Sequence, residues 1–228
     1  MRHRRARRRE IIEQLMNHTT IRDDLRLYIE TRILPRYDTF DRAHGRDHVL
    51  QVMARATELA ERMGEDIETA YTAAAYHDTG LSMGREHHHE ESARIIRADH
   101  NLRRWFTGEQ IETIACAAED HRASASRPPR SIYGRIVAEA DRAIDPESII
   151  RRTVQYGLAH SPQLDREAQW QRCEEHLRQK YGHEGYLRLW LEESPNAEPL
   201  ARLRQLIADT ERLRSLFEKI YYEETANK

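Results

Sequence analysis

The sequence is poor in the residues that favour β-sheets. It contains four valines among 228 residues, with 9 glycines and 7 prolines, whereas alanine, leucine, glutamate and arginine dominate. β-Branched residues favour strands, and the abundant residue types here favour helices. The chain also lacks the G-x-G-x-x-G and P-loop motifs that mark nucleotide-binding α/β folds. The composition therefore predicts an all-α protein and argues against a nucleotide-binding α/β domain.

Cysteines and long apolar runs are scarce as well. The two cysteines, Cys116 and Cys173, lie far apart and form no C-x-x-C pair. The sequence shows no secretory leader and no apolar run of membrane-spanning length. We therefore expect a protein of the reducing cytoplasm without a membrane partner.

Lysine is rare, and the charges nearly balance. The chain has 34 arginines, 3 lysines and a formal net charge of −2, so it has no overall attraction for polyanions. Six arginines lie within residues 2–9 and form a basic N-terminal arm. Such arms can bind nucleic acid, but no aromatic residues are interleaved with these arginines. We therefore expect no nucleic-acid partner.

Apolar residues recur at helical spacing along most of the chain. Together with the glycine breaks, the spacing predicts helices at about 48–63, 66–78, 88–99, 108–120, 131–144, 165–180 and 197–223. We expect one helical bundle in three parts. These are an N-terminal helical segment with the basic arm (1–35, its helix ending before Pro35), a core (36–150) and a C-terminal helical extension packed on the core (151–228).

Several histidines and aspartates fall on the apolar faces of these predicted helices. His48 lies four residues before Val52, and Asp141 lies four residues after Val137. A buried carboxylate must be paired, protonated or bound to a metal, because leaving it unpaired is very costly. His77 and Asp78 are adjacent, so they offer an imidazole nitrogen and a carboxylate oxygen to one point. Divalent cations of borderline hardness select such mixed ligands.

The order His48, His77-Asp78, Asp141 resembles the HD-domain superfamily of metal-dependent phosphohydrolases. The surrounding sequences Ala-Ala-Tyr-His-Asp-Thr-Gly-Leu and Ala-Glu-Ala-Asp-Arg strengthen the resemblance, which covers roughly residues 40–150. It implies that the core is an all-α HD-domain bundle. It also implies that these four residues bind a divalent metal ion (Mn, Mg, Fe, Co, Ni or Zn) and that Asp78 orients the attacking water.

A second metal ion is left open. HD proteins that bind two ions carry extra histidines between the His-Asp pair and the last aspartate, and His88 and His121 match those positions best, with His89 as a substitute for His88. The chain departs from the commonest pattern at Asp120-His121, where a pair of histidines is often found. We therefore expect one ion, with His88 and His121 available for a second ion or for substrate.

The resemblance implies hydrolysis of a phosphorylated small molecule, a nucleotide among the candidates. Three arginines flank the predicted ligands and are candidates for binding phosphate: Arg85, Arg122 and Arg130. One guanidinium group can bind two phosphate oxygens at once. His44, one turn before His48, is a candidate to support a ligand or to touch substrate. Two alternatives stay open: an HD-type di-iron oxygenase, and a non-catalytic metal-containing module that binds a phosphorylated ligand. The sequence also leaves open whether the chain forms a homo-oligomer.

Overall fold

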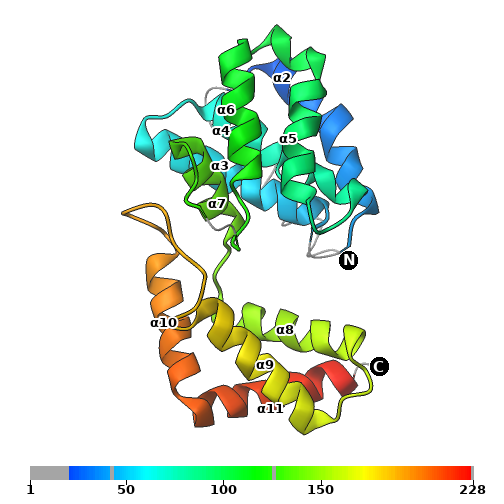
Figure 1. Cartoon of the computed structure of the whole chain (residues 1–228), viewed down its shortest axis with the longest axis vertical. Helices are drawn as coiled ribbons and strands as arrows, with labels where there is room; N and C mark the ends of the chain where they lie inside the picture. The colour runs from blue at the N-terminus through cyan, green and yellow to red at the C-terminus, as the bar shows by residue number, and fades with distance from the viewer. Residues whose placement is uncertain (1–20, 42–43, 125–126, 227–228) are drawn as a thin grey trace. The chain divides into compact units, whose positions relative to one another are not determined.

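The computed structural model describes residues 21–41, 44–124 and 127–226 (Figure 1). Within these ranges the chain forms helices and connecting segments without a strand, which confirms the predicted all-α fold. The basic arm at residues 2–9 lies outside the described residues. Among the residues described, no helix is both long enough and apolar enough to cross a membrane.

The chain divides into two compact units, Met1–Arg142 and Ala143–Lys228. The N-terminal segment and the core expected from the sequence therefore share one unit. The division falls eight residues before the boundary expected at 150, and residues 143–150 group with the C-terminal helices. The expected packing of those helices on the core stays a prediction.

The first unit is built around α4. Its described helices are α2 (Asp23–Tyr28), η1 (Ile29–Ile33), η2 (Leu34–Thr39), α3 (Arg46–Met63), α4 (Ile67–Tyr76), η3 (Thr79–Met83), α5 (His88–Ala98), η4 (His100–Arg104), α6 (Gly108–Glu119) and α7 (Ile132–Asp141). Every residue of α4 from Thr69 to Tyr76 is buried, and α4 packs against α3, α6 and α7. Its run of alanines, Ala73–Ala75, presents little side-chain bulk, so the neighbouring helices can approach closely.

The predicted boundaries of α3 to α7 agree with the structure to within three residues, and side-chain caps mark the starts of α4, α6 and α7. The side chain of Asp66 accepts a hydrogen bond from the backbone N–H of Thr69 (2.7 Å) and begins α4. Thr107 and Gln110 form a reciprocal capping box at the start of α6. Ser131 caps α7 in the same way as Asp66 caps α4.

The helical path continues past Pro35, where the sequence predicted an end. Pro35 lies in the first turn of the 3-10 helix η2, which runs to Thr39. Proline is tolerated at this position because the N–H that it lacks has no partner in the first turn of a helix. The path therefore changes from an α-helix through a π-helical turn to a 3-10 helix, and it carries Tyr37 into the core.

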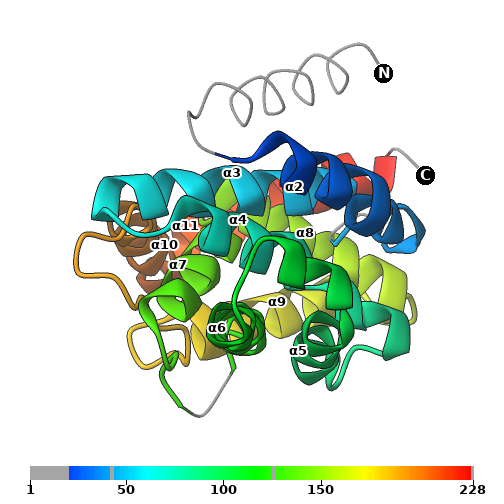
Figure 2. The ribbon, with the colours of Figure 1, turned by 90° about the horizontal axis from the view of Figure 1, so that it is seen from above.

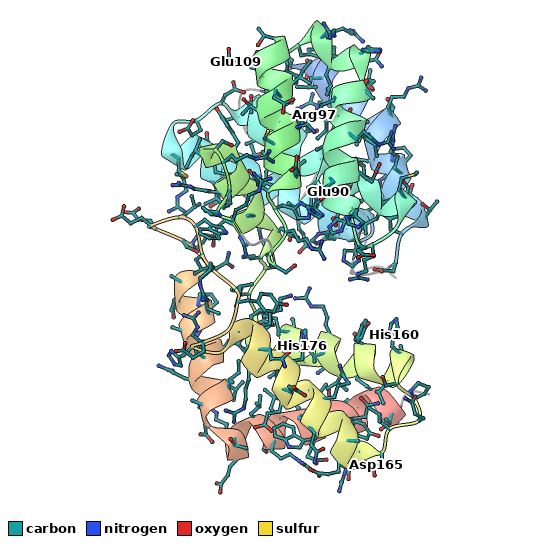
Figure 3. All side chains as sticks on the ribbon, in the orientation of Figure 1. Glu90, Arg97, Glu109, His160, Asp165 and His176 are labelled. Atoms are coloured by element: carbon teal, nitrogen blue, oxygen red, sulfur yellow. The ribbon has the colours of Figure 1, made fainter. Side chains whose placement is uncertain are left out.

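The pair α5 and α6 lies side by side (Figure 2). An ion pair closes this contact at the surface, where Arg97 of α5 meets Glu112 of α6 at 2.6 Å and Glu119 at 3.8 Å (Figure 3). The 3-10 helix η3 also packs on α5. This arrangement brings the N-terminus of α5 and the C-terminus of α6 to the same end of the unit.

The second unit contains four described helices: α8 (Pro146–His160), α9 (Arg166–Tyr181), α10 (Ala197–Ala208) and α11 (Thr210–Ala226). The helix α8 was not predicted, although Asp145 caps it and Pro146 occupies its first turn, which is a recognised start signal. The single helix predicted at 197–223 is instead two helices, because the backbone leaves the helical region at Asp209 (ψ 87°).

Candidate metal centre

Six histidine and aspartate side chains converge at the ends of helices in the first unit. His48 lies in the first turn of α3, His77 and Asp78 follow α4, His88 begins α5, His121 follows α6, and Asp141 ends α7. All six were singled out in the sequence, and the structure brings them together in two sets that share Asp78.

The first set contains the four residues expected to bind one ion. His48 Nε2 lies 3.3 Å from His77 Nε2, and His77 Nε2 lies 3.3 Å from Asp78 Oδ2. Asp141 Oδ1 lies 3.2 Å from His48 Nε2 and 3.9 Å from His77 Nε2. The two imidazole nitrogens and the Asp78 oxygen lie close enough together to hold one ion, and Asp141 approaches the same two imidazoles. Nitrogen and carboxylate oxygen donors together suit a divalent cation of borderline hardness.

The second set contains the two histidines whose role was left open. His88 Nε2 and His121 Nε2 each lie 3.5 Å from Asp78 Oδ1, and they lie 3.3 Å from one another. Asp78 therefore directs Oδ2 to the first set and Oδ1 to the second. A carboxylate arranged in this way could bridge two metal ions.

Backbone carbonyls at helix ends hold two of the imidazoles. His77 Nδ1 donates a hydrogen bond to the carbonyl of Ala74 (2.8 Å), and His121 Nδ1 donates to that of Ala118 (2.5 Å). The last carbonyls of a helix lack partners within the helix, so these histidines satisfy them. With Nδ1 carrying the proton, the Nε2 lone pair of each ring is available to a metal.

A hydrogen bond from Nδ1 to a backbone carbonyl is present in His88 but not in its neighbour His89. His88 Nδ1 donates to the carbonyl of Arg85 (2.8 Å), which leaves Nε2 facing Asp78. His89 belongs to neither set. Its Nδ1 is buried without a hydrogen-bond partner, and its Nε2 lies 3.9 Å from Glu90. His88 is thus better placed than His89 to act with His121.

Strong electrostatic coupling joins Asp78 to its histidine neighbours. Burial raises the pKa of the Asp78 carboxyl, but the charges and hydrogen bonds of His77 and His121 outweigh burial and hold this pKa well below its usual range. Burial lowers the pKa of His77, but Asp78 outweighs it and raises this pKa to about 9. Burial and the charge of His121 lower the pKa of His88 to about 4. A metal ion at the first set therefore has to displace a proton from His77.

His44 lies beside the first set without bonding to its side chains in the described structure. Its ring centroid is 6.2 Å from that of His48, and its Nδ1 lies 2.8 Å from Asp41 Oδ1. Its Nε2 faces Arg85 Nη2 at 3.3 Å. Arg85 is otherwise largely exposed, with 66% of its side chain accessible.

The other two arginines considered for phosphate have protein partners. Arg122 donates to the carbonyl of Glu86 (2.7 Å). Arg130 is held by Asp120 (2.9 Å) and Glu119 (3.2 Å), and its backbone N–H also donates to Asp120. Arg130 thus fastens the segment after α6, and its charge is already balanced by two carboxylates.

Two residues that support the centre were missed in the sequence. Tyr37 is buried, donates to the carbonyl of Ala75 (2.9 Å) and accepts from the backbone N–H of Asp78 (3.3 Å). No spacing rule connects a tyrosine in an irregular segment with a site forty residues later. The sequence marks Gly80 because it follows the His-Asp pair, but its role in the site comes from a contact with a different helix. Its N–H donates to Ser92 Oγ of α5 (2.9 Å).

The comparison with protein-family models agrees with this geometry. Residues 45–144 match the family model of the HD domain, and all six residues of the two sets lie within the match. Among solved structures, the chain is similar to a predicted HD superfamily hydrolase from an uncultured Thermotogales bacterium. That similarity has 25% sequence identity and a TM-score of 0.47, and it covers 66% of this chain and 83% of the other. No curated protein matches the sequence significantly.

The first prediction concerns Gly80. A Cβ at this position would lie 2.0 Å from the carbonyl oxygen of His88 and 2.6 Å from the backbone nitrogen of Ser92. We therefore expect Gly80→Ala to push η3 away from α5 and to lower the free energy of unfolding by roughly 1–3 kcal/mol, as overpacking does. Gly108→Ala, where a Cβ meets open space, serves as the control in urea denaturation. Equal stability of the two variants would contradict this account.

The second prediction concerns pH and metal affinity. The pKa of His77 in the metal-free protein is raised to about 9, so below that pH a cation must displace the His77 proton. We expect the apparent affinity for Mn²⁺ to rise about tenfold per pH unit from pH 7.5 and to level off above pH 9. Calorimetric titration in buffers of different ionisation enthalpy measures both the affinity and the protons released. An affinity that is flat between pH 7.5 and 9 would contradict the displacement of a His77 proton by the metal in this range.

Proposed function

The chain belongs to the HD-domain superfamily, and we propose that it is a metal-dependent phosphohydrolase with two ion sites. His48, His77, Asp78 and Asp141 hold one divalent ion, and Asp78, His88 and His121 hold the second. The observation that carries the proposal is the orientation of Asp78, whose two oxygens lie 3.3 to 3.8 Å from imidazole nitrogens of two separate sets. The sequence alone favoured one ion, and this geometry favours two.

The donor chemistry of the site fits divalent ions. Three of its four histidines donate Nδ1–H to a backbone carbonyl and direct Nε2 to the centre, the arrangement that accompanies metal-binding histidines. When bound, the ions lower the pKa of a coordinated water and neutralise charge on the phosphoryl group. The buried Asp78 carboxylate is ionised at neutral pH and can orient the attacking water by accepting its hydrogen bond.

Differences in exposure indicate the side from which substrate approaches. The side chains of His48 and Asp141 are 20% and 27% exposed, whereas those of His77 and Asp78 are 0% and 4% exposed. A phosphate group therefore reaches the centre past His48 and Asp141. On the His48 side it meets Arg85, whose side chain is the most exposed of the three arginine candidates.

Arg85 is accordingly assigned the role of binding substrate phosphate. Its contacts with His44 (3.3 Å) and with Asp41 (3.7 Å) hold the side chain near the first set without neutralising it through a buried ion pair. Exposed ion pairs of this kind contribute little free energy, so a phosphate can compete for the guanidinium. His44 supports this assignment because it lies between Arg85 and His48.

The third prediction tests catalysis. We expect the Mn²⁺-loaded protein to release phosphate from a panel of nucleotides and sugar phosphates, and Asp78→Ala to lower kcat by at least about 10²-fold while helical content survives. Because His88 and His121 lie equally far from Asp78, their alanine variants should lose activity to a similar degree. His87→Ala is the matched control, since His87 is exposed and belongs to neither set.

Steady-state phosphate release and far-ultraviolet circular dichroism provide the two measurements. Full activity in both His88→Ala and His121→Ala would remove the second ion from the proposal. Absence of turnover on every ester, with metal bound, would instead favour a module that binds a phosphorylated ligand.

A second function, oxidation by an HD-type di-iron centre, is favoured by the same shared carboxylate, because that chemistry requires His88 and His121 as ligands. Metal dependence separates the two functions. A phosphohydrolase works with Mn²⁺ or Mg²⁺ in the absence of oxygen, whereas an oxygenase requires iron, consumes O₂ and shows a visible absorption band. Anaerobic phosphate release by the Mn²⁺-loaded protein would therefore exclude the oxygenase function for the substrate tested.

A further inference from the structure

The segment between η3 and α5, residues Gly84–His87, carries the carbonyl that orients one of the candidate ligands. Gly84 has a positive φ of 115°, so the chain turns sharply at the start of this segment. The carbonyl of Arg85 accepts the hydrogen bond from His88 Nδ1 (2.8 Å). The direction in which His88 presents Nε2 therefore depends on the position of the Arg85–Glu86 peptide.

One side chain fastens the next peptide, Glu86–His87, to the rest of the site. Arg122 Nη1 donates to the carbonyl of Glu86 at 2.7 Å. Arg122 directly follows His121, whose own ring is held by the carbonyl of Ala118 (2.5 Å). The contact thus joins the segment that orients His88 to the segment that carries His121.

We propose that Arg122 is a positioning residue that sets the affinity of the second ion site. This inference rests on the proposed function, because it assumes that His88, His121 and Asp78 bind an ion. Arg122 acts through the Glu86 carbonyl and the Arg85 carbonyl, which hold His88 Nε2 at 3.5 Å from Asp78 Oδ1 and 3.3 Å from His121 Nε2. The role differs from the phosphate binding considered for Arg122 in the sequence.

Electrostatics and positioning predict opposite effects when the arginine is removed. A guanidinium near a cation site repels the cation, so removal of the charge alone should strengthen metal binding. Loss of a residue that orients a ligand should weaken metal binding, typically 10–100-fold for supporting hydrogen bonds around metal ligands. The sign of the change in affinity therefore distinguishes the two effects.

The experiment titrates the metal-free full-length chain with Mn²⁺, with calorimetry for affinity and elemental analysis for the number of ions bound. We expect Arg122→Met to lower the affinity for the second ion about 10–100-fold and to leave the affinity for the first ion unchanged. Arg122→Lys, which keeps a donor and the charge, should lose less. Arg127→Met is the matched control, because Arg127 is a nearby arginine that pairs with Glu119 and Asp120 and, among the described residues, forms no hydrogen bond or ion pair with the 84–87 segment.

The outcomes separate this inference from the proposed function. The positioning role would be overturned if Arg122→Met binds two ions as tightly as the unaltered chain does. It would also be overturned if the affinities for both ions fall equally. A single ion in the unaltered chain would overturn it together with the two-ion site. Selective loss of the second ion without phosphate release from any ester would support the positioning role and refute hydrolysis. If Arg122→Met does not fold, the affinities of Arg122→Lys decide by the same criterion.

Discussion

The Asp78 carboxylate, buried and surrounded by four imidazoles, is the constraint on which the rest of the first unit depends. A buried anion is tolerated only when hydrogen bonds and opposite charges compensate the loss of water. Here the compensation comes from His48 and His77 on one side and from His88 and His121 on the other. Because these histidines come from different helices, α3 to α6 must meet at this point for the carboxylate to be buried.

Helix ends are well suited to build such a centre. A helix leaves unpaired carbonyls at its C-terminus, and His77 and His121 use those of α4 and α6 to fix their rings. His48 and His88 instead begin helices, where side chains project beyond the helix body. The small residues around Asp78 complete the arrangement, since the alanines of α4 and Gly80 allow α3, α6 and α5 to approach closely.

The sequence-based predictions agree with the structure where the interactions that decide a feature act over a short stretch of the chain. The boundaries of α3 to α7 were predicted to within three residues, and caps such as Asp66 and Thr107, which act over a single turn, mark starts among them. The site residues were found from the inward spacing of residues such as His48 and Asp141 and from the resemblance of their order to the HD-domain superfamily. In the second unit, α8 was missed although Asp145 and Pro146 give it a local start signal, and the break at Asp209 was missed as well.

The sequence by itself determined the all-α class, the first-unit helices and the identity of the six candidate ligands, because residue type and helical spacing are local properties. Only the tertiary structure decided how Asp78 divides its oxygens between two sets, that His88 rather than His89 faces His121, and that Arg130 is held by Asp120. It also placed Tyr37 on the backbone of Asp78. These features depend on contacts between segments ten to forty residues or more apart, whose directions no local pattern encodes.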